Sequence, residues 1–451
     1  MYRNVINDFA GWYESRKRKI LYVKGAYGVG KTWAVKDFAT AFFGDFKYID
    51  MSKDNIFTKP ITGKFEEADA EDFEDAYISK EDIEDVSMES RIADMDFLLE
   101  QHFDRSDFSD TLLIFDEVGA LSGSDEFFHR YTQVHRNYTI CLIASTMEIT
   151  EYEYGHPDVF QIVRMRPMSF EEYMIANKAH PMIAAIERNK SKSLTRLEEG
   201  AVLAMLKEYM LIGGMPLAVF TYLKTKNYNR VREVQNDLIE KYRQIIKSSL
   251  SPAVAQRCRR IWNSIPKQLE KGNKKFMYKL VEENARAREY SEAAQKLCDL
   301  GFVRKLPRLT EGIIPLEEHV DYKSFEFFMT DHGLLRAVYG LPADEALSLL
   351  DIFTEKNGAI AEQYIFQELS AKVGYLYYWV SGATARVPFV YESDSGPVPV
   401  DVRFMTNNKA QNIKTFKQKN PSTEISLKIS LEQVSLDEGV LNIPAYGLWN
   451  M

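Results

Sequence analysis

Cysteine is scarce in this chain of 451 residues. The three present, Cys141, Cys258 and Cys298, lie far apart and form no metal-binding spacing. An odd, sparse set excludes a disulfide framework and is typical of buried thiols in a reducing compartment. Long apolar runs are missing as well. No stretch approaches the roughly 18 apolar residues that cross a bilayer, and the first residues, MYRNVINDFAGWYESRKRK, lack the apolar centre of a signal peptide. We therefore expect a cytoplasmic protein that does not enter a membrane.

An excess of basic charge is also lacking. The 57 Lys and Arg residues are outnumbered by 66 Asp and Glu, which leaves a net charge of −9. This balance excludes a basic, nucleic-acid-binding surface over the whole molecule, but it allows a local basic patch. The hydrophobic content of 45% is that of an ordinary globular protein, and the length suffices for two or three domains.

A glycine-rich stretch follows the first apolar run. ILYVKG predicts a buried strand, and KTWAVKDFATAFF has helical spacing. Between them, GAYGVGKT fits the pattern G-x-x-x-x-G-K-[ST], in which glycines let backbone N–H groups point at phosphate oxygens beside a helix N-terminus. We expect Lys31 to reach the β- and γ-phosphates of a bound nucleotide and Thr32 to ligate Mg²⁺. The residues expected to contact the nucleotide are Gly25, Ala26, Tyr27, Gly28, Val29, Gly30, Lys31, Thr32, Trp33 and Arg166.

A second motif supplies carboxylates. TLLIFDEVGAL predicts a strand that ends in Asp116 and Glu117. Asp116 at a strand end can join the Mg²⁺ coordination shell together with Thr32. Glu117 is placed to orient or deprotonate the attacking water. With Lys31 and Ser145, these two carboxylates form the predicted catalytic set.

Two weaker signals follow. YTICLIASTMEI predicts a strand that ends in Ser145 and Thr146, and in P-loop ATPases of the AAA class a polar residue here senses the γ-phosphate or the attacking water. We assign this role to Ser145, with Thr146 as the alternative. In VFQIVRMRPMSF, Arg164 and Arg166 share one face of an extended segment. One interpretation is that both are surface charges. The other is that Arg166 contacts the γ-phosphate, either of its own chain's nucleotide (in cis) or of a neighbour's (in trans).

The remainder of the chain changes character. An acidic stretch at about 60–92 is either solvated or a docking segment for a partner. From about residue 195 helices dominate, and residues 274–309 predict helix, turn, helix and a β-hairpin wing. Residues 257–288 are rich in basic side chains, so this winged-helix module either contacts DNA or packs against protein. The basic residues are Arg257, Arg259, Arg260, Lys267, Lys271, Lys274, Lys275, Lys279, Arg286 and Arg288.

Several stretches together resemble the bacterial and archaeal ATP-binding proteins that join an AAA-type ATPase domain to a C-terminal domain of unknown function. They are YVKGAYGVGKTWAVKDFA, LLIFDEV, RPMSFEEYM, LIGGMPLAV, FEFFMTDHGLLRAVYG, NGAIAEQYIFQEL, LYYWVS and NIPAYGLW. The resemblance implies ATP as ligand and an α/β protein of three parts. These are a P-loop ATPase domain at 1–180 with a parallel sheet and flanking helices, a helical winged-helix domain at 195–345, and a restriction-endonuclease-like α/β domain at 350–451.

The C-terminal part departs from the family pattern where nucleases bind metal. Family members show Glu-Val-Asp-Phe on one strand and Glu-Val-Lys on the next. Here Pro388 replaces the aspartate and Arg403 the lysine, while Glu362 and Asp401 remain. Proline neither binds metal nor donates a backbone hydrogen bond. We therefore expect no nuclease activity from this domain.

The sequence thus predicts a slow Mg²⁺-dependent ATP hydrolase that acts as a nucleotide-gated switch for the attached domains. The alternative is a DNA-binding regulator in which ATP controls the basic winged-helix module. A protein partner or self-association would fit either interpretation, and the sequence names neither the partner nor the DNA site.

Overall fold

The computed structural model describes residues 1–15, 19–52, 87–121, 123–190, 192–342, 348–382, 385–404 and 411–451. By their internal contacts these residues form two compact units. The N-terminal unit comprises Asn4–Gly25 and Gly30–Met165, and the C-terminal unit comprises Met1–Arg3, Ala26–Val29 and Arg166–Met451. Of the acidic stretch expected at about 60–92, residues 60–86 lie outside the described residues. Its last part opens helix α3.

The N-terminal unit is built on a five-stranded parallel sheet with the order β2-β3-β4-β1-β5. β1 and β3 are buried along their whole length, which fits their unbroken apolar sequences. Because β4 lies between β1 and β3, the residues that follow these three strands come together at one edge of the sheet. The strands are β1 (Ile20–Lys24), β2 (Phe46–Asp50), β3 (Leu112–Asp116), β4 (Thr139–Ala144) and β5 (Phe160–Arg164).

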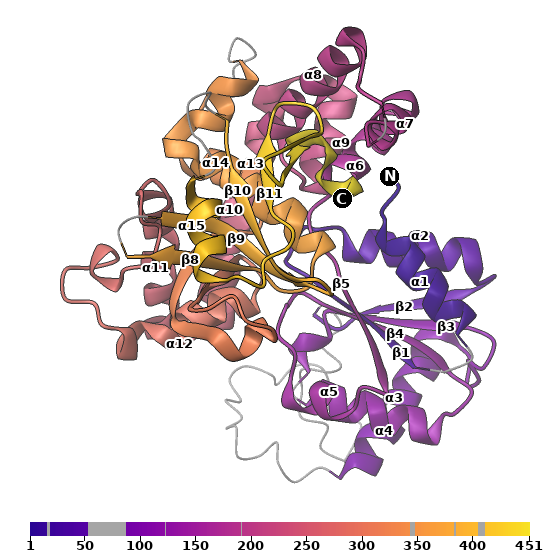
Figure 1. Ribbon diagram of the computed structural model, residues 1–451. Helices are drawn as coiled ribbons and strands as arrows, with labels where there is room; N and C mark the ends of the chain where they lie inside the picture. Colours follow the sequence, from indigo (N-terminus) through magenta and orange to yellow (C-terminus); the bar gives the residue numbers. More distant parts are fainter. Residues whose placement is uncertain are drawn as a thin grey trace. The chain divides into compact units, whose positions relative to one another are not determined.

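Helices cover both faces of this sheet, as Figure 1 shows. On one face, α1 and α2 pack through aromatic rings, with Phe9 and Phe38 centroids 5.5 Å apart. On the other, α3 and α4 bury a cluster that includes Leu99, Phe115 and Phe128. The parallel sheet with flanking helices confirms the expected mixed α/β fold of the N-terminal part. The helices are α1 (Val5–Glu14), α2 (Lys31–Phe42), α3 (Met88–Phe103), η2 (Val118–Ala120), α4 (Ser124–Val134) and α5 (Glu151–Gly155).

The C-terminal unit contains one eight-stranded sheet with the order β12-β13-β11-β10-β9-β8-β6-β7. β6 pairs antiparallel with β7, which lies beyond the stretch where a hairpin wing was predicted, and parallel with β8. A single sheet therefore takes strands from both of the parts expected at 195–345 and 350–451. Three consecutive strands, β8 to β10, pair antiparallel. The strands are β6 (Val303–Leu309), β7 (Val320–Met329), β8 (Tyr377–Ser381), β9 (Ala385–Ser393), β10 (Gly396–Val402), β11 (Leu427–Ser430), β12 (Ser435–Asp437) and β13 (Val440–Pro444).

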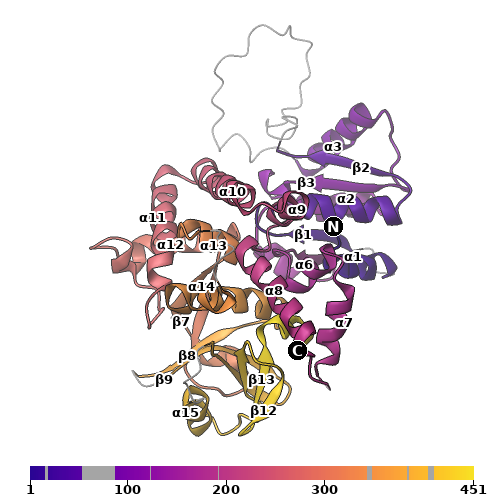
Figure 2. The same ribbon diagram turned by 90° about the horizontal axis from the view of Figure 1, so that it is seen from above.

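Helices α14 and α15 lie on opposite sides of this sheet (Figure 2). Phe366 of α14 stacks on Phe328 at 4.3 Å, whereas Phe416 of α15 packs against Trp379 at 5.1 Å. In chain order, this unit contains the following helices. They are α6 (Phe170–Ala176), α7 (His180–Arg188), α8 (Arg196–Ile212), α9 (Pro216–Thr225), α10 (Tyr228–Ser249), α11 (Pro252–Leu269), η3 (Tyr278–Leu280), α12 (Ala287–Asp299), η4 (Leu316–His319), α13 (His332–Val338), α14 (Leu349–Lys372), α15 (Gln411–Lys419) and η5 (Ala445–Asn450).

The two distinctive motifs GGMP and TDHG meet in the core of the C-terminal unit. Asp331 caps α13 by accepting from Leu334 N at 3.0 Å, and it also accepts from Gly214 N at 2.7 Å. A Cβ atom on Gly213 would lie 2.4 Å from Asp331 Oδ1 and 2.8 Å from the Cα of Gly333. Gly213 also has a φ of 82°, which disfavours any side chain. The α8–α9 turn therefore needs glycine for both conformation and space.

Of the described part of the chain, no single helix is long and apolar enough to span a membrane. α8 and α9 together pass that test by length and composition only, and they are bent by 120° at their junction.

Candidate nucleotide site

The glycine-rich loop lies where the sequence predicted it, between β1 and α2. Gly28 and Gly30 have φ values of 85° and 90°, in the left-handed region that glycine adopts without strain. Ala34 N donates to Gly30 O at 3.0 Å, so the helix begins directly after the loop. The loop therefore ends at a helix N-terminus, which is the geometry that favours an anion.

Lys31 is the buried cation of the site, with 5% of its surface exposed. Its Nζ donates to Gly25 O at 2.9 Å and to Ser145 Oγ at 3.0 Å. Burial lowers the pKa of Lys31, and the charges of Glu117 and Asp116 oppose that shift. The lysine is thus held between the loop backbone and the end of β4.

Asp116 ends β3 in contact with Thr32. Thr32 Oγ1 donates to Asp116 Oδ2 at 2.6 Å, so the two predicted Mg²⁺ ligands are adjacent. The backbone N–H of Glu117 donates to the other oxygen, Oδ1, at 2.8 Å. Hydroxyl and carboxylate oxygens are the donors that Mg²⁺ prefers, and Mg²⁺ usually takes only one or two protein ligands beside phosphate and water. The residues present fit that ion.

Tyr48 is a member of the site that the sequence interpretation missed. Its hydroxyl donates to Asp116 Oδ2 at 3.0 Å, the same oxygen that Thr32 contacts. Burial raises the pKa of Tyr48, and the negative charge of Asp116 adds to the shift. Tyr48 comes from β2, a strand the sequence interpretation did not assign. The pairing of β2 with β3 places Tyr48 beside Ile114, two residues before Asp116.

Glu117 follows the strand in a left-handed conformation, with a φ of 54°. Non-glycine residues with positive φ are uncommon and often occur at functional sites. One carboxylate oxygen accepts from Ser145 Oγ at 2.5 Å and the other from Ser145 N at 3.3 Å. Ser145 therefore joins Lys31 to Glu117. Thr146, the alternative residue, instead accepts from Glu148 N at 3.1 Å.

The other side chains considered for the nucleotide are Trp33, Arg164 and Arg166. Trp33 on α2 is 47% exposed. Arg164 is the exposed last residue of β5. Arg166 belongs to the C-terminal unit, where its carbonyl accepts from Arg3 Nη2 at 2.6 Å. The assignment of Arg166 to the γ-phosphate stays a prediction.

The carboxylates of the C-terminal domain are engaged with cations. Glu362 on α14 accepts from both Nη atoms of Arg386, at 3.1 and 2.9 Å, and from Lys274 Nζ at 2.9 Å. Arg386 also donates twice to Glu326, at 3.1 and 2.7 Å. Burial raises the pKa of Glu362, but Arg386 and Lys274 outweigh it and lower the value to about 2. We call Lys274, Glu326, Glu362 and Arg386 the buried charge cluster.

Asp401 is separate from that cluster and pairs with Arg403 at 2.8 Å. Pro388 lies in β9 beside a register shift in the β8–β9 pairing. Val387 and Val390 both pack in the hydrophobic cluster that contains Phe416. The strand therefore departs from strict alternation of buried and exposed side chains between these two residues. The two surviving carboxylates, Glu362 and Asp401, thus each face an arginine. Nuclease inactivity stays a prediction.

The basic stretch 257–288 is only partly available to a ligand. Lys274 is buried and bound to Glu362, so its assignment to a DNA-facing surface is wrong. Arg260 pairs with Glu282 and also donates to the Tyr290 hydroxyl at 3.2 Å. Six cationic residues of the stretch are exposed, and they are Arg259, Arg260, Lys267, Lys279, Arg286 and Arg288.

Three stretches of the chain match the models of known families. Residues 17–174 match the profile of an AAA domain, residues 203–345 that of a domain of unknown function (DUF8612), and residues 357–446 that of another (DUF4143). The chain thus carries an AAA-type P-loop ATPase domain and a DUF4143 C-terminal domain. No curated protein sequence matches.

Solved structures show only distant likeness. A Walker-type ATPase of Pyrococcus abyssi shares 12% identity with a TM-score of 0.41, over 74% of this chain and 94% of that one. PCH-2 of C. elegans shares 14% identity with a TM-score of 0.29, over 50% and 64% of the two chains. The Hsp104–ADP complex of S. cerevisiae shares 13% identity with a TM-score of 0.28, over 65% and 38%.

Proposed function

We propose that this protein binds ATP with Mg²⁺ at the loop Gly25–Thr32 and hydrolyses it slowly. The observation that carries the proposal is a continuous set of contacts in the N-terminal unit: Thr32 to Asp116, and Lys31 through Ser145 to Glu117. The AAA-domain match over the same residues supports it.

Each side chain then has a physical task. Lys31 gives up its contacts with Gly25 O and Ser145 to bind the β- and γ-phosphates as a point charge. Thr32 and Asp116 hold Mg²⁺, which neutralises charge on the phosphate oxygens. Glu117 orients the attacking water and accepts its proton, and Ser145 fixes the direction of that carboxylate. Turnover is slow unless an arginine reaches the γ-phosphate, and Arg166 is the candidate.

We further propose that the nucleotide acts as a switch for the C-terminal unit. Ala26–Val29, in the middle of the phosphate loop, make their contacts within that unit. There the Tyr242 hydroxyl donates to Tyr27 O at 2.9 Å, and a Cβ on Gly28 would lie 2.9 Å from Leu238. A movement of the loop on binding phosphate would therefore change its contacts with α10. The winged-helix segment α11–α12–β6–β7 and the nuclease-like strands would be the parts that respond.

ATP binding and turnover, measured separately, test the proposed function. Lys31→Ala should abolish binding of a fluorescent ATP analogue, because it removes the phosphate-binding charge. Glu117→Gln should retain binding and stop hydrolysis, because the amide cannot accept the proton of water. Normal turnover by the Glu117→Gln protein would refute the role given to that carboxylate.

A second candidate is a DNA-binding regulator, and the six exposed cations of residues 257–288 favour it. DNA affinity carried by these residues should fall steeply as salt rises. Charge reversal of Arg286 and Arg288 together should weaken that affinity and leave ATP binding unchanged. Equal DNA affinity of the reversed variant would remove this candidate.

A further inference from the structure

A cavity of about 520 Å³ lies in the N-terminal unit, away from the nucleotide loop. Its floor includes Ile20 and Thr139, the first residues of β1 and β4. The loop begins at the other end of β1, and Ser145 follows the other end of β4. Because these strands are parallel, the cavity lies at the opposite edge of the same sheet. It is therefore a separate site.

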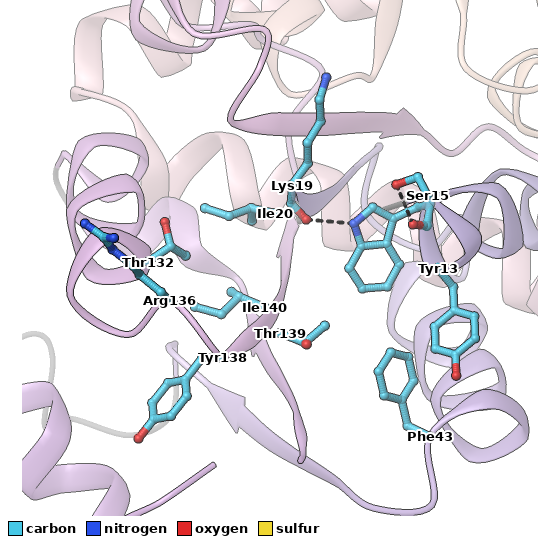
Figure 3. A pocket seen from close by; sticks show the side chains of 11 residues that line it. Tyr13, Ser15, Lys19, Ile20, Phe43, Thr132, Arg136, Tyr138, Thr139 and Ile140 are labelled. Carbon is cyan, nitrogen blue, oxygen red and sulfur yellow. Dashed lines mark hydrogen bonds between the residues drawn. The ribbon is translucent and has the colours of Figure 1, made fainter. Parts of the chain in front are cut away.

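Aromatic side chains form much of the wall. Figure 3 shows Tyr13 and Phe43 on one side, Tyr138 on the other and Thr139 with Ile140 between them. The Tyr13 and Phe43 ring centroids are 5.1 Å apart in an edge-to-face arrangement. Trp12 is fixed by its indole N–H, which donates to Lys19 O at 2.7 Å. Tyr13 is nevertheless 46% exposed, so part of its face remains open to a ligand.

The charge around this cavity is positive. Its lining residues include Lys19 and Arg136 and, among the described residues that line it, no Asp or Glu. The Lys19 ammonium donates to Pro157 O at 2.7 Å and points away from the rings in Figure 3. It adds positive charge near the rim rather than a contact inside the cavity.

We propose that this cavity binds single-stranded nucleic acid. One base enters beside Tyr13 and Phe43, and the adjoining phosphates lie beside Arg136 and Lys19. Aromatic rings accept a base by stacking, and cations along the rim track the phosphate backbone. A single strand of nucleic acid would thus contact both the aromatic rings and the cations, whereas an acidic peptide would contact the cations alone. The proposal does not depend on ATP, because no residue of the nucleotide site takes part.

Binding of a labelled oligothymidylate of about twelve nucleotides, within the usual range of single-strand sites, tests the proposal. Fluorescence anisotropy of the full chain without ATP should show binding that weakens as salt rises. Tyr13→Ala should raise Kd about fivefold or more, as expected for loss of a stacked base, whereas Tyr13→Phe should retain binding. Arg136→Ala should weaken binding and make it less sensitive to salt.

Two matched controls separate this site from general effects. Tyr154→Ala removes an exposed tyrosine of the same unit outside the cavity, and Arg130→Ala removes an exposed arginine from the same helix as Thr132. Both should bind as the wild type does, and so should Lys31→Ala, which is defective only in ATP binding. Thermal unfolding of each variant checks that it is folded.

The proposal is wrong if the wild type does not bind the oligonucleotide. It is also wrong if folded Tyr13→Ala binds normally, or if Tyr154→Ala and Arg130→Ala lose as much affinity as their counterparts. Tighter binding of thymidine monophosphate than of the oligonucleotide would contradict it and assign the cavity to a free nucleotide.

Discussion

Replacing Arg386 with methionine should destabilise the C-terminal unit strongly. The guanidinium of Arg386 makes two hydrogen bonds to Glu326 and two to Glu362, and Glu326 is fully buried. Methionine keeps much of the side-chain volume but removes the charge. Two buried carboxylates would then share only Lys274, which contacts Glu362 at 2.9 Å.

Breaking a buried ion pair from one side costs roughly 3–5 kcal/mol, because it leaves an uncompensated charge. At roughly 2 °C per kcal/mol for a large domain, the midpoint of thermal unfolding should fall by about 6–10 °C. Circular dichroism at 222 nm during heating would measure it. As a control, Arg243→Met removes an exposed arginine paired with Glu240 at 3.4 Å, and such pairs contribute about 0–1 kcal/mol.

The effect should also depend on pH. In the wild type, the lowered pKa of Glu362 contributes stability above about pH 4.5, and this stability is lost as the pH falls toward 2. In Arg386→Met, burial without the arginine raises the pKa of Glu326 further, so the folded state takes up a proton. The variant therefore loses stability as pH rises from about 4.5, and the difference from wild type should be larger at pH 7 than at pH 5.

Glu326→Gln in the Arg386→Met background should restore part of the lost stability, because the neutral amide removes one buried charge. An Arg386→Met protein that unfolds at the wild-type temperature, at both pH 5 and pH 7, would refute the reasoning. It would mean that the four charges are not buried together.

Three further outcomes follow from the site and the core. Ser145→Ala should lower kcat about tenfold or more with little change in ATP affinity, since Glu117 loses the hydrogen bond from the Ser145 hydroxyl. Thr146→Ala should leave both unchanged, and a normal kcat for Ser145→Ala would contradict this. Tyr48→Phe should lower the Mg²⁺ concentration for half-maximal hydrolysis by about two- to tenfold, because the tyrosine hydroxyl competes with the metal for Asp116 Oδ2. A higher Mg²⁺ concentration for half-maximal hydrolysis would show instead that the hydroxyl favours metal binding. Gly213→Ala should cost more than about 2 kcal/mol of unfolding free energy, whereas Gly272→Ala, with open space at its Cβ, should cost little; denaturant titration of both variants compares them.

The positions of the glycine-rich loop and of the two carboxylates that follow β3 could be predicted because each is local. A strand, a glycine-rich turn and a helix lie within the 23 residues from Ile20 to Phe42, and the Asp116–Glu117 pair ends its own apolar strand. The order of these motifs along the chain also indicated that Ser145 would face them. Parallel strands bring their carboxyl ends to one edge, so the order in sequence is enough to predict proximity.

The parts that could not be predicted depend on distant pairing. Tyr48 reaches Asp116 only because β2 pairs with β3, and the sequence between them does not specify that register. Lys274, with its basic neighbours, was assigned to a surface, but it is buried against Glu362, 88 positions later. The pairing of Arg308 with Tyr378, which extends one sheet across the expected domain boundary, has no local signal either.

The central claim is that Lys31, Thr32 and Asp116 bind one Mg²⁺–triphosphate. A crystal structure of the protein with Mg²⁺ and a non-hydrolysable ATP analogue tests it most directly. The account predicts Mg²⁺ at about 2.1 Å from Thr32 Oγ1, with Asp116 in its coordination shell and Lys31 Nζ on the phosphates. A triphosphate bound elsewhere, or one that leaves Lys31 on Gly25 O and Ser145, would contradict it.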